Sequence, residues 1–281
     1  MINSIIDFIR SVMRDLATWD AKVKPWFRGE SSDDLPLRPK IASFDHNEEN
    51  YLLQSFRRKA GALSNVPPRE HTDLWLFLAQ HYNVPTRLLD WTEGALMALY
   101  FAINRAEANP RVYMLNPRSL NNHAGVETYD LNYPLSWIHI GGLYVALAWQ
   151  NRDIGRIKRN MEAQLKQSRQ DLSPDKIEQE LEAIRNLSLK IPLAFPATYQ
   201  DQRMIAQRSC FTIHGEDLRP MQEILSDSNI DLTECLFEYK IDIQAKNLML
   251  QELSILGISA ATIFPDLDHL AEDLKSDVED L

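Results

Sequence analysis

The sequence predicts an α+β domain with a mixed or antiparallel central sheet flanked by helices. Segments with helical periodicity and short β-rich segments follow one another without the regular strand–helix alternation of a parallel fold. The 281 residues are 44% hydrophobic and 25% charged, which is typical of globular domains. Because no internal repeat or low-complexity segment divides the chain, we expect a single domain over residues 1–281.

The first elements are a helix and a short strand. Residues 1–20 have helical periodicity, and residues 23–27 are expected to be extended, with Pro25 favouring the edge of the sheet. Residues 28–34 are polar and indicate a loop. The apolar face expected for the helix consists of Ile2, Ile5, Ile6, Ile9, Val12, Met13, Leu16 and Trp19.

The next elements alternate in type. We expect helices over residues 47–63 and 73–82, an extended piece over 86–91, a helix rich in small residues over 93–107, and a strand over 111–115. A further helix is expected over 143–150.

A charged helical hairpin is expected over residues 156–190, interrupted at Ser173-Pro174. It lacks aromatic residues, so it is predicted to be an insertion rather than part of the core. The predicted core then comprises residues 22–150 and 191–281.

The C-terminal part predicts strands over residues 210–214 and 236–243 and helices over 249–256 and 266–277. Residues 261–264 between these two helices are expected to be extended.

Charge and cysteine content narrow the function classes. The net charge of −10 leaves no overall basic field for nucleic acid. Seven acidic residues and one lysine lie between Asp266 and Leu281, which favours a solvated helix over a docking site for a basic partner.

Two cysteines without metal-ligand spacing indicate a reducing cytoplasm. The apolar stretches are too short to span a bilayer, so no membrane partner is expected.

The segment Trp26-Phe27-Arg28-Gly29-Glu30 is the first candidate for chemistry. A guanidinium presents paired donors that suit phosphate or carboxylate. A glycine lets a ligand or a second backbone approach closely. The alternative is that Arg28 only pairs with a carboxylate and fixes the loop.

The second candidate is the segment that runs from His81 to Thr92 through Val84-Pro85-Thr86. The Thr86 hydroxyl could bond a ligand or Arg28, and His81 could act as a general base. Each residue also has a structural alternative: His81 suits a helix C-terminus, Arg87 could pair with Glu93, Asp90 and Glu93 have capping-box spacing, and Trp91 and Tyr100 suit a core.

These segments resemble the FRG family, whose name denotes a Phe-Arg-Gly motif. The resemblance extends over residues 22–115 and 195–270 and does not include the charged hairpin. It implies a bacterial setting in mobile or defence-related loci, and hence a toxin in anti-phage defence with an antitoxin or chaperone partner. The matching pieces are Phe27-Arg28-Gly29, Leu37 and Pro39, the segment from His81 to Thr92, and the segments 201–215 and 257–268.

The order of parts also resembles an ADP-ribosyltransferase fold, which implies NAD as co-substrate, RNA, DNA or protein as acceptor, and no metal. Arg28 would lie on the first strand, Thr86 on the second, and Gln207 before the last. The catalytic residues so implied are Arg28, His81, Thr86 and Gln207. The NAD-binding residues so implied are Phe27, Arg28, Gly29, Thr86, Arg87 and Tyr100.

A glutamine at position 207 cannot supply the negative charge that cleavage of a glycosidic bond needs. The resemblance therefore requires another carboxylate, with Glu30, Asp90, Glu93 and Asp201 as the candidates. Otherwise the chain is a non-catalytic nucleotide-sensing or protein-interaction module. A nuclease is less favoured because no acidic cluster has metal-binding spacing, and Cys210 lies in an apolar run typical of a core.

Overall fold

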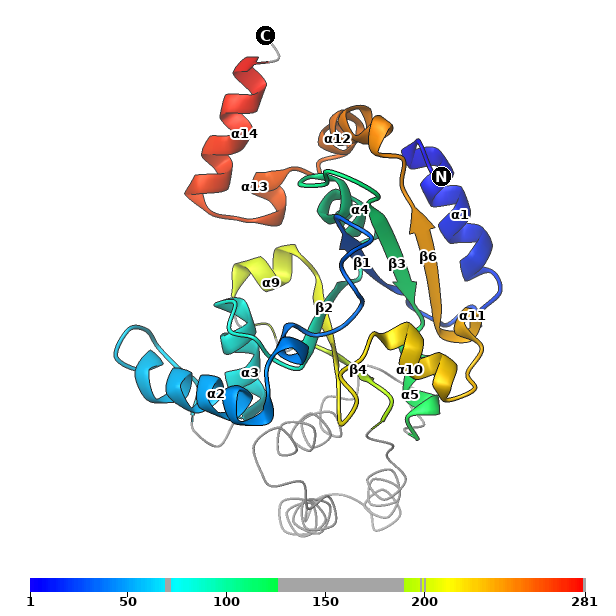
Figure 1. Ribbon diagram of the computed structural model, residues 1–281. Helices are drawn as coiled ribbons and strands as arrows, with labels where there is room; N and C mark the ends of the chain where they lie inside the picture. Colours follow the sequence, from blue (N-terminus) through cyan, green and yellow to red (C-terminus); the bar gives the residue numbers. More distant parts are fainter. Residues whose placement is uncertain (69–71, 126–189, 198, 200, 280–281) are drawn as a thin grey trace.

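A computed structural model describes residues 1–68, 72–125, 190–197, 199 and 201–279. The predicted α+β class is confirmed: the described chain contains a six-stranded antiparallel sheet in the order β4-β5-β2-β1-β3-β6, with helices on both faces (Figure 1). The strands are β1 (Trp26–Glu30), β2 (Leu88–Thr92), β3 (Arg111–Leu115), β4 (Leu193–Pro196), β5 (Ser209–Ile213) and β6 (Leu236–Lys240).

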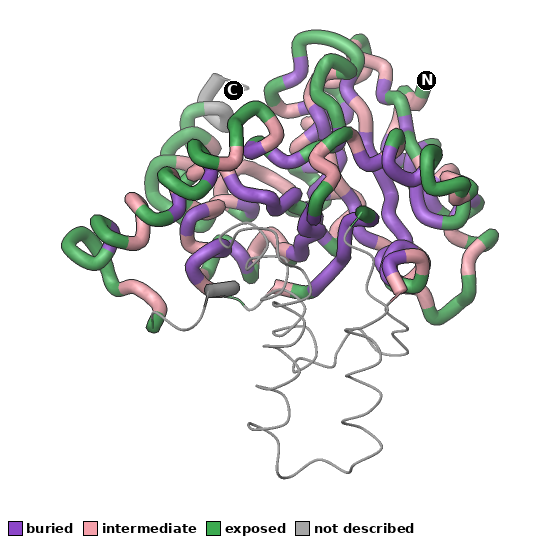
Figure 2. The backbone as a smooth tube through the Cα atoms, turned by 60° about the horizontal axis from the view of Figure 1, so that its bottom comes forward, coloured by how far each residue is buried: buried purple, intermediate pink, exposed green. Residues whose placement is uncertain are grey.

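Two hydrophobic clusters cover the two faces of the sheet. One cluster includes side chains of α1, α4, α12 and α13, and the other includes side chains of α2, α3, α5 and α10. Buried residues therefore run through the strands, and exposed residues lie on the outer helices (Figure 2). The helices are α1 (Ile5–Leu16), α2 (His46–Ala60), α3 (Thr72–His81), α4 (Ala95–Ile103), α5 (Pro117–His123), α9 (Gln202–Ala206), α10 (Met221–Asp227), α11 (Leu232–Cys235), α12 (Lys246–Ile255), α13 (Ala260–Ile263) and α14 (Leu267–Glu279), with short 3-10 turns at Lys40–Ser43 and Ile243–Ala245.

Helix α1 is confirmed, but its predicted apolar face is wrong in part. Ile5, Phe8 and Val12 are buried. Three residues of the expected face, Ile6, Ile9 and Met13, are exposed. Phe8 was not part of that face, yet it packs edge-on against Tyr239 of β6. The helix therefore has two apolar faces, and the one that contacts β6 is the one that is buried.

Strand β1 corrects two predictions. It is a central strand rather than an edge strand, and Arg28, Gly29 and Glu30 belong to it rather than to a loop. Pro25 immediately precedes the first strand residue, where its missing N–H costs no ladder bond. Five residues of β1 pair in register with β3, from Trp26 opposite Leu115 to Glu30 opposite Arg111.

Gly29 lies under helix α4. A Cβ atom at this position would lie 2.0 Å from the carbonyl oxygen of Ala98 and 2.5 Å from the amide nitrogen of Ala102. The small residues expected on this helix therefore let its backbone contact the sheet. Of the two roles foreseen for Gly29, the close approach of a second backbone is the one that the structure shows.

Strands β1 and β2 separate soon after they meet. Their register contains a single pair, Phe27 opposite Thr92, whereas β2 pairs with β5 over five residues. The sheet thus consists of two three-stranded halves that diverge on one side of this pair. This divergence provides room for a pocket in the middle of the sheet.

The C-terminal half adds one strand that the sequence did not predict. Edge strand β4 is held by the buried side chain of Asn121, whose amide nitrogen donates to the Ala194 carbonyl and whose carbonyl accepts from the Ala194 amide. Residues 261–264 were expected to be extended, but Ala260–Ile263 forms helix α13. Helix α14 follows and projects from the body (Figure 1). The predicted helix at 143–150 and the hairpin at 156–190 lie outside the described residues, apart from Lys190.

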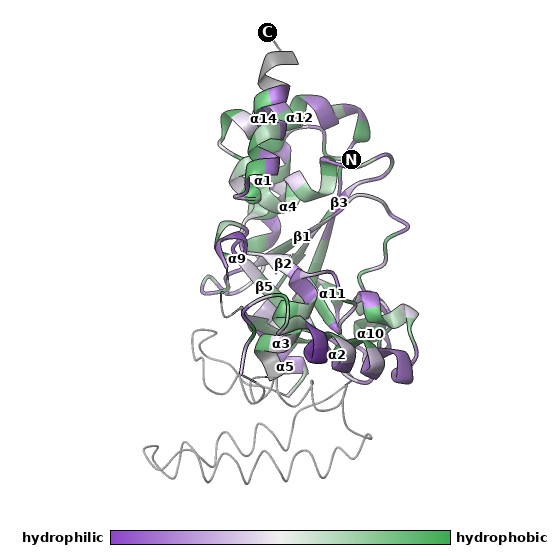
Figure 3. Cartoon of the chain, turned by 90° about the vertical axis from the view of Figure 1, so that its left-hand side faces the viewer, coloured by the Kyte–Doolittle hydropathy of each residue, from purple (hydrophilic) through white to green (hydrophobic). Residues whose placement is uncertain are grey.

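Hydropathy varies between neighbouring helices. Hydrophilic residues dominate α2, which lies outside the more hydrophobic α3 (Figure 3). None of the described helices is long and apolar enough to cross a bilayer.

His214 follows β5 and is completely buried, and neither ring nitrogen has a hydrogen-bond partner among the residues that the structure describes. Burial lowers the pKa of His214 from 6.5 to about 3. The unfolded chain therefore binds a proton below pH 6.5 that the folded chain does not bind, so stability decreases as the pH falls from 6.5 towards 3.

We expect this histidine to add up to about 1.4 kcal/mol of destabilisation per pH unit in that interval. His214→Leu should flatten the dependence of the unfolding free energy on pH between 6.5 and 4, measured by urea denaturation. Gly61→Ala, which changes no titratable side chain, is the control and should keep the wild-type slope. An unchanged slope in His214→Leu would contradict the assignment.

Candidate functional site

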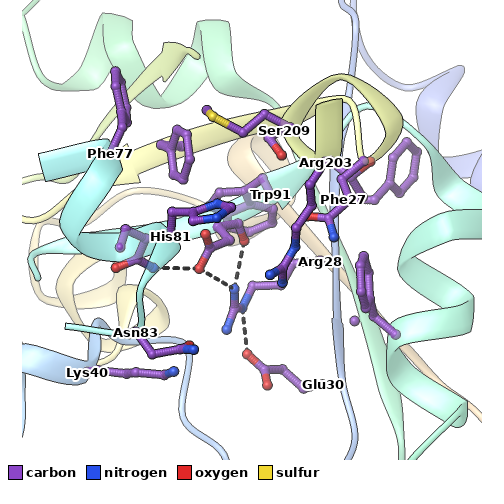
Figure 4. Close-up of a pocket in the computed structure, with 18 of the residues that line it drawn as sticks. Phe27, Arg28, Glu30, Lys40, Phe77, His81, Asn83, Trp91, Arg203 and Ser209 are labelled. Carbon is purple, nitrogen blue, oxygen red and sulfur yellow. Dashed lines mark hydrogen bonds and ion pairs between the residues drawn. The ribbon is translucent and has the colours of Figure 1, made fainter. Parts of the chain in front are cut away.

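A cavity of about 310 Å³ opens where β1 and β2 diverge. Helix α3, the N-terminal part of β5 and helix α9 complete its wall (Figure 4). Aromatic residues form part of the lining, among them Phe27, Phe77, Trp91, Phe101 and Phe211. Its polar side chains include Arg28, Glu30, Gln80, His81, Asp90, Arg203 and Gln207.

Arg28 bridges the gap between the two diverging strands. Its Nε donates to Glu30 Oε1 at 2.5 Å, and its Nη1 donates to the backbone carbonyl of Asp90 at 2.7 Å. The Asp90 carboxylate lies 3.9 Å from the same Nη1. The foreseen carboxylate pair is therefore present, and the guanidinium also faces the pocket.

Thr86 does not line this cavity, contrary to its predicted place beside Arg28. It is fully buried, and its hydroxyl donates to Gln80 Oε1 at 2.7 Å. The Gln80 amide in turn donates to Asp90 Oδ2 at 2.7 Å. Thr86 therefore supports the pocket wall indirectly, through Gln80 and Asp90.

The threonine that does line the pocket is Thr92, at the end of β2. Thr92 belongs to the motif that runs from His81, although no role is expected for it there. The sequence does contain a signal for this residue, because Thr92 immediately precedes the helix rich in small residues. Its hydroxyl accepts from the Gly94 amide, which fixes the turn into α4.

Arg87 is also absent from the cavity, and its suggested pairing with Glu93 is wrong. It forms two hydrogen bonds of 2.7 Å with Glu49 of α2 and donates to the Gly215 carbonyl. Glu49 is 2% exposed, so the ion pair is buried. Glu93 instead lies 4.0 Å from Arg208 at the surface.

Tyr100 does not reach the pocket either, because it belongs to the core cluster around α4. Burial raises the pKa of its hydroxyl. The next residue, Phe101, lines the pocket instead. The capping-box alternative for Asp90 is wrong as well, since Asp90 is a strand residue and Gly94 is the N-cap of α4.

His81 lines the pocket at the end of α3. Its Nδ1 lies 3.1 Å from Asp201 Oδ2, and Asp201 also caps α9 by accepting from the Met204 amide. The carboxylate holds the ring in one orientation, so this pair has the geometry of an oriented base.

Gln207 ends helix α9 and lines the pocket. Its Nε2 is buried and has no hydrogen-bond partner among the described residues. An unsatisfied buried donor is costly, so this atom suits an acceptor supplied by a ligand. The structure thus brings together Phe27, Arg28, Gly29, His81 and Gln207 of the predicted set.

Metal ligands and thiols are two further kinds of reactive side chain, considered over the described part of the chain. No group of three or more His, Cys, Asp or Glu side chains there could hold a metal ion. Cys210 is buried, and burial raises the pKa of its thiol well above the usual value. It packs in the core, as its apolar neighbourhood indicates.

The fold and the pocket define an α+β domain with an arginine-bearing central strand beside a polar cavity. Residues 24–111, which contain β1, β2 and α4 and end at the first residue of β3, match the family model of the FRG domain. Over these residues the match supports the resemblance to the FRG family that the sequence implied. Comparison with curated proteins gives no significant match, and comparison with solved structures gives none.

Proposed function

We propose that this chain is an NAD-dependent ADP-ribosyltransferase that acts on a macromolecule, either a nucleic acid or a protein. The observation that carries the proposal is the convergence of Arg28, His81, Asp90 and Gln207 on one cavity. These groups come from the first strand, helix α3, the second strand and the turn before β5. The resemblance to transferases implies an arginine on the first strand, a threonine on the second and a glutamine before the last; Arg28 and Gln207 line the cavity as proposed, with Thr92 in place of Thr86.

The residues present suit a ligand such as NAD. Arg28 has donors on Nη2 that can hold a phosphate oxygen, and the buried Nε2 of Gln207 has no acceptor within the described part of the chain. Phe101 and Phe27 offer apolar surface to a flat ring. A volume of about 310 Å³ is at the lower end for small-molecule pockets, so the cavity would take one end of a dinucleotide.

The chemistry requires a negative charge beside the breaking bond. When the nicotinamide–ribose bond breaks, its electron pair leaves with nicotinamide and positive charge develops on the ribose carbon. Of the four carboxylates considered, Glu30 and Asp90 line the cavity, Asp201 pairs with His81, and Glu93 lies at the surface. The Asp90 side chain is 57% exposed and Glu30 only 8%, so Asp90 is the proposed stabilising group.

His81 would complete the transfer. An acceptor hydroxyl or amine loses a proton as its oxygen or nitrogen bonds to the ribose carbon. The His81 ring, oriented by Asp201, would take that proton. FRG domains suggest the setting, a cytoplasmic toxin of anti-phage defence that an antitoxin or chaperone partner would keep in check.

The test is incubation with NAD labelled in its adenine moiety, together with mixed RNA, DNA and protein acceptors. We expect release of nicotinamide and a labelled macromolecule. Arg28→Lys should reduce the rate nearly as much as Arg28→Ala, by about 10²-fold, because lysine cannot reproduce the planar fork. Arg208→Lys, outside the pocket, is the matched control.

Thermal melting of each variant would separate catalytic loss from unfolding, since Arg28 also contacts the buried Glu30. Full activity of Arg28→Lys would show that only charge is needed there. Absence of both nicotinamide release and labelled product from the wild type would rule out the transferase.

One observation favours a second candidate, a non-catalytic nucleotide-sensing module. Arg28 contacts both Glu30 and Asp90, which offsets the negative charge that the reaction needs. Calorimetry that shows tight nucleotide binding without nicotinamide release would select this alternative.

A further inference from the structure

Helix α9 presents two hydrogen-bond donors to the pocket. Arg203 and Gln207 both line the cavity and are four residues apart. Residues with this spacing lie on one side of a helix, about one turn apart. Their side chains therefore lie on the same wall of the pocket. Helix α9 precedes β5, in the half of the sheet formed by β4, β5 and β2, whereas Arg28 lies in the half formed by β1, β3 and β6.

Arg203 is held by an aromatic ring rather than by an acid. Its guanidinium carbon lies 4.8 Å from the centre of the Phe264 ring. Phe264 is itself stacked on His269 at 4.3 Å and packs edge-on against Phe101. No carboxylate among the described residues forms an ion pair with Arg203. Its planar donors are thus oriented but not neutralised (Figure 4).

Arg28 differs in this respect. Its Nε and Nη1 already donate to Glu30 and to the Asp90 carbonyl. The pocket therefore contains one partly neutralised arginine on β1 and one unneutralised arginine on α9. The Nε2 of Gln207, which has no partner among the described residues, adds a neutral donor to the same pocket.

We infer that Arg203 and Gln207 form a second anion subsite, so that the pocket recognises a diphosphate rather than a single phosphate. Arg28 contacts one phosphoryl group, and the α9 pair contacts the other. This inference rests on the proposed function in taking the ligand to be a nucleotide. It adds that the class is a nucleoside diphosphate or its esters, and it assigns Phe264 to hold the second arginine in place.

The experiment compares the binding of ADP and AMP by calorimetry at fixed salt concentration. Wild type is expected to bind ADP more tightly than AMP by about tenfold to a hundredfold, the usual effect of one charge-assisted contact. Arg203→Gln should bind the two nucleotides equally. Gln207→Met, which keeps the side-chain length without the donor, should reduce the preference.

Arg208→Gln removes the same charge from the end of α9 outside the pocket, and it should keep the preference for ADP. Preference retained in Arg203→Gln, or lost equally in Arg208→Gln, would overturn the inference. So would a wild type that binds neither nucleotide or binds both alike.

Nicotinamide release by the wild type separates this inference from the proposed function. If NAD is cleaved while Arg203→Gln keeps its preference for ADP, the subsite is wrong and the transferase stands. If the preference depends on Arg203 but no nicotinamide is released, the subsite stands and the transferase is wrong.

Discussion

Gly29→Ala is expected to prevent the domain from reaching its native fold. The added methyl group would lie 2.0 Å from the Ala98 carbonyl oxygen. Neither group can rotate away, because the Cβ position is fixed by the strand backbone and the carbonyl by the helix backbone. Helix α4 would have to leave the sheet, and with it the buried contacts of Leu99 and Ile103. We expect a loss of more than about 4 kcal/mol, in the range of the most severe core substitutions. Soluble yield and urea denaturation measure the effect.

Gly61→Ala is the control for this substitution. Gly61 ends helix α2 with a φ of −63°, and its added Cβ would lie 3.6 Å from a Val66 methyl group. Alanine fits there, and the unfolding free energy should change by less than about 1 kcal/mol. If Gly29→Ala were as stable as Gly61→Ala, the tight contact between β1 and α4 would be wrong.

Glu49→Ala is expected to cost about 3–5 kcal/mol, because it leaves the Arg87 guanidinium buried without its carboxylate. The Arg87 side chain is 10% exposed and that of Glu49 is 2% exposed, so water cannot replace the lost partner. The pair also joins α2 to the start of β2, and Arg87 further bonds the Gly215 carbonyl. Chemical denaturation at pH 7 measures the loss.

Two variants show whether the effect comes from the buried charge. Glu93→Ala removes an exposed carboxylate 4.0 Å from Arg208, and it should cost less than about 1 kcal/mol. The double variant Glu49→Leu with Arg87→Met removes both charges together and should recover much of the stability that Glu49→Ala loses. A double variant no more stable than Glu49→Ala would contradict this explanation.

The elements that could be predicted are those whose pattern is local. Strand β3 has the predicted bounds, Arg111–Leu115, because its apolar run is closed by Pro110 and Pro117. The predicted first strand ends at residue 27, because Arg28 and Glu30 are polar. In the structure both belong to β1, where their opposite charges pair within the sheet. Strand β4 has only four residues, and the Asn121 side chain that holds it lies far away in sequence.

The sequence predicts which kinds of residue line the candidate site better than it predicts which positions they occupy. Arg28, His81 and Gln207 share the cavity as expected. Thr86 does not, because β2 begins at Leu88 and Gln80 takes the threonine hydroxyl. The partner of Arg87 lies 38 residues away on helix α2, so local spacing could not identify it. Arg203 lies within the segment 201–215 that resembles the family, yet only its stacking on Phe264 shows its orientation.

The divergence of β1 from β2 gives this sheet two borders at its centre. Strand borders carry unpaired N–H and C=O groups, and on the outside of a protein such groups invite pairing with another chain. Here they lie beside the pocket between the two strands, where the Arg28 side chain already donates to the Asp90 carbonyl. These main-chain polar groups are therefore available to a small molecule in the pocket, and they do not form an outer strand edge that could pair with another chain.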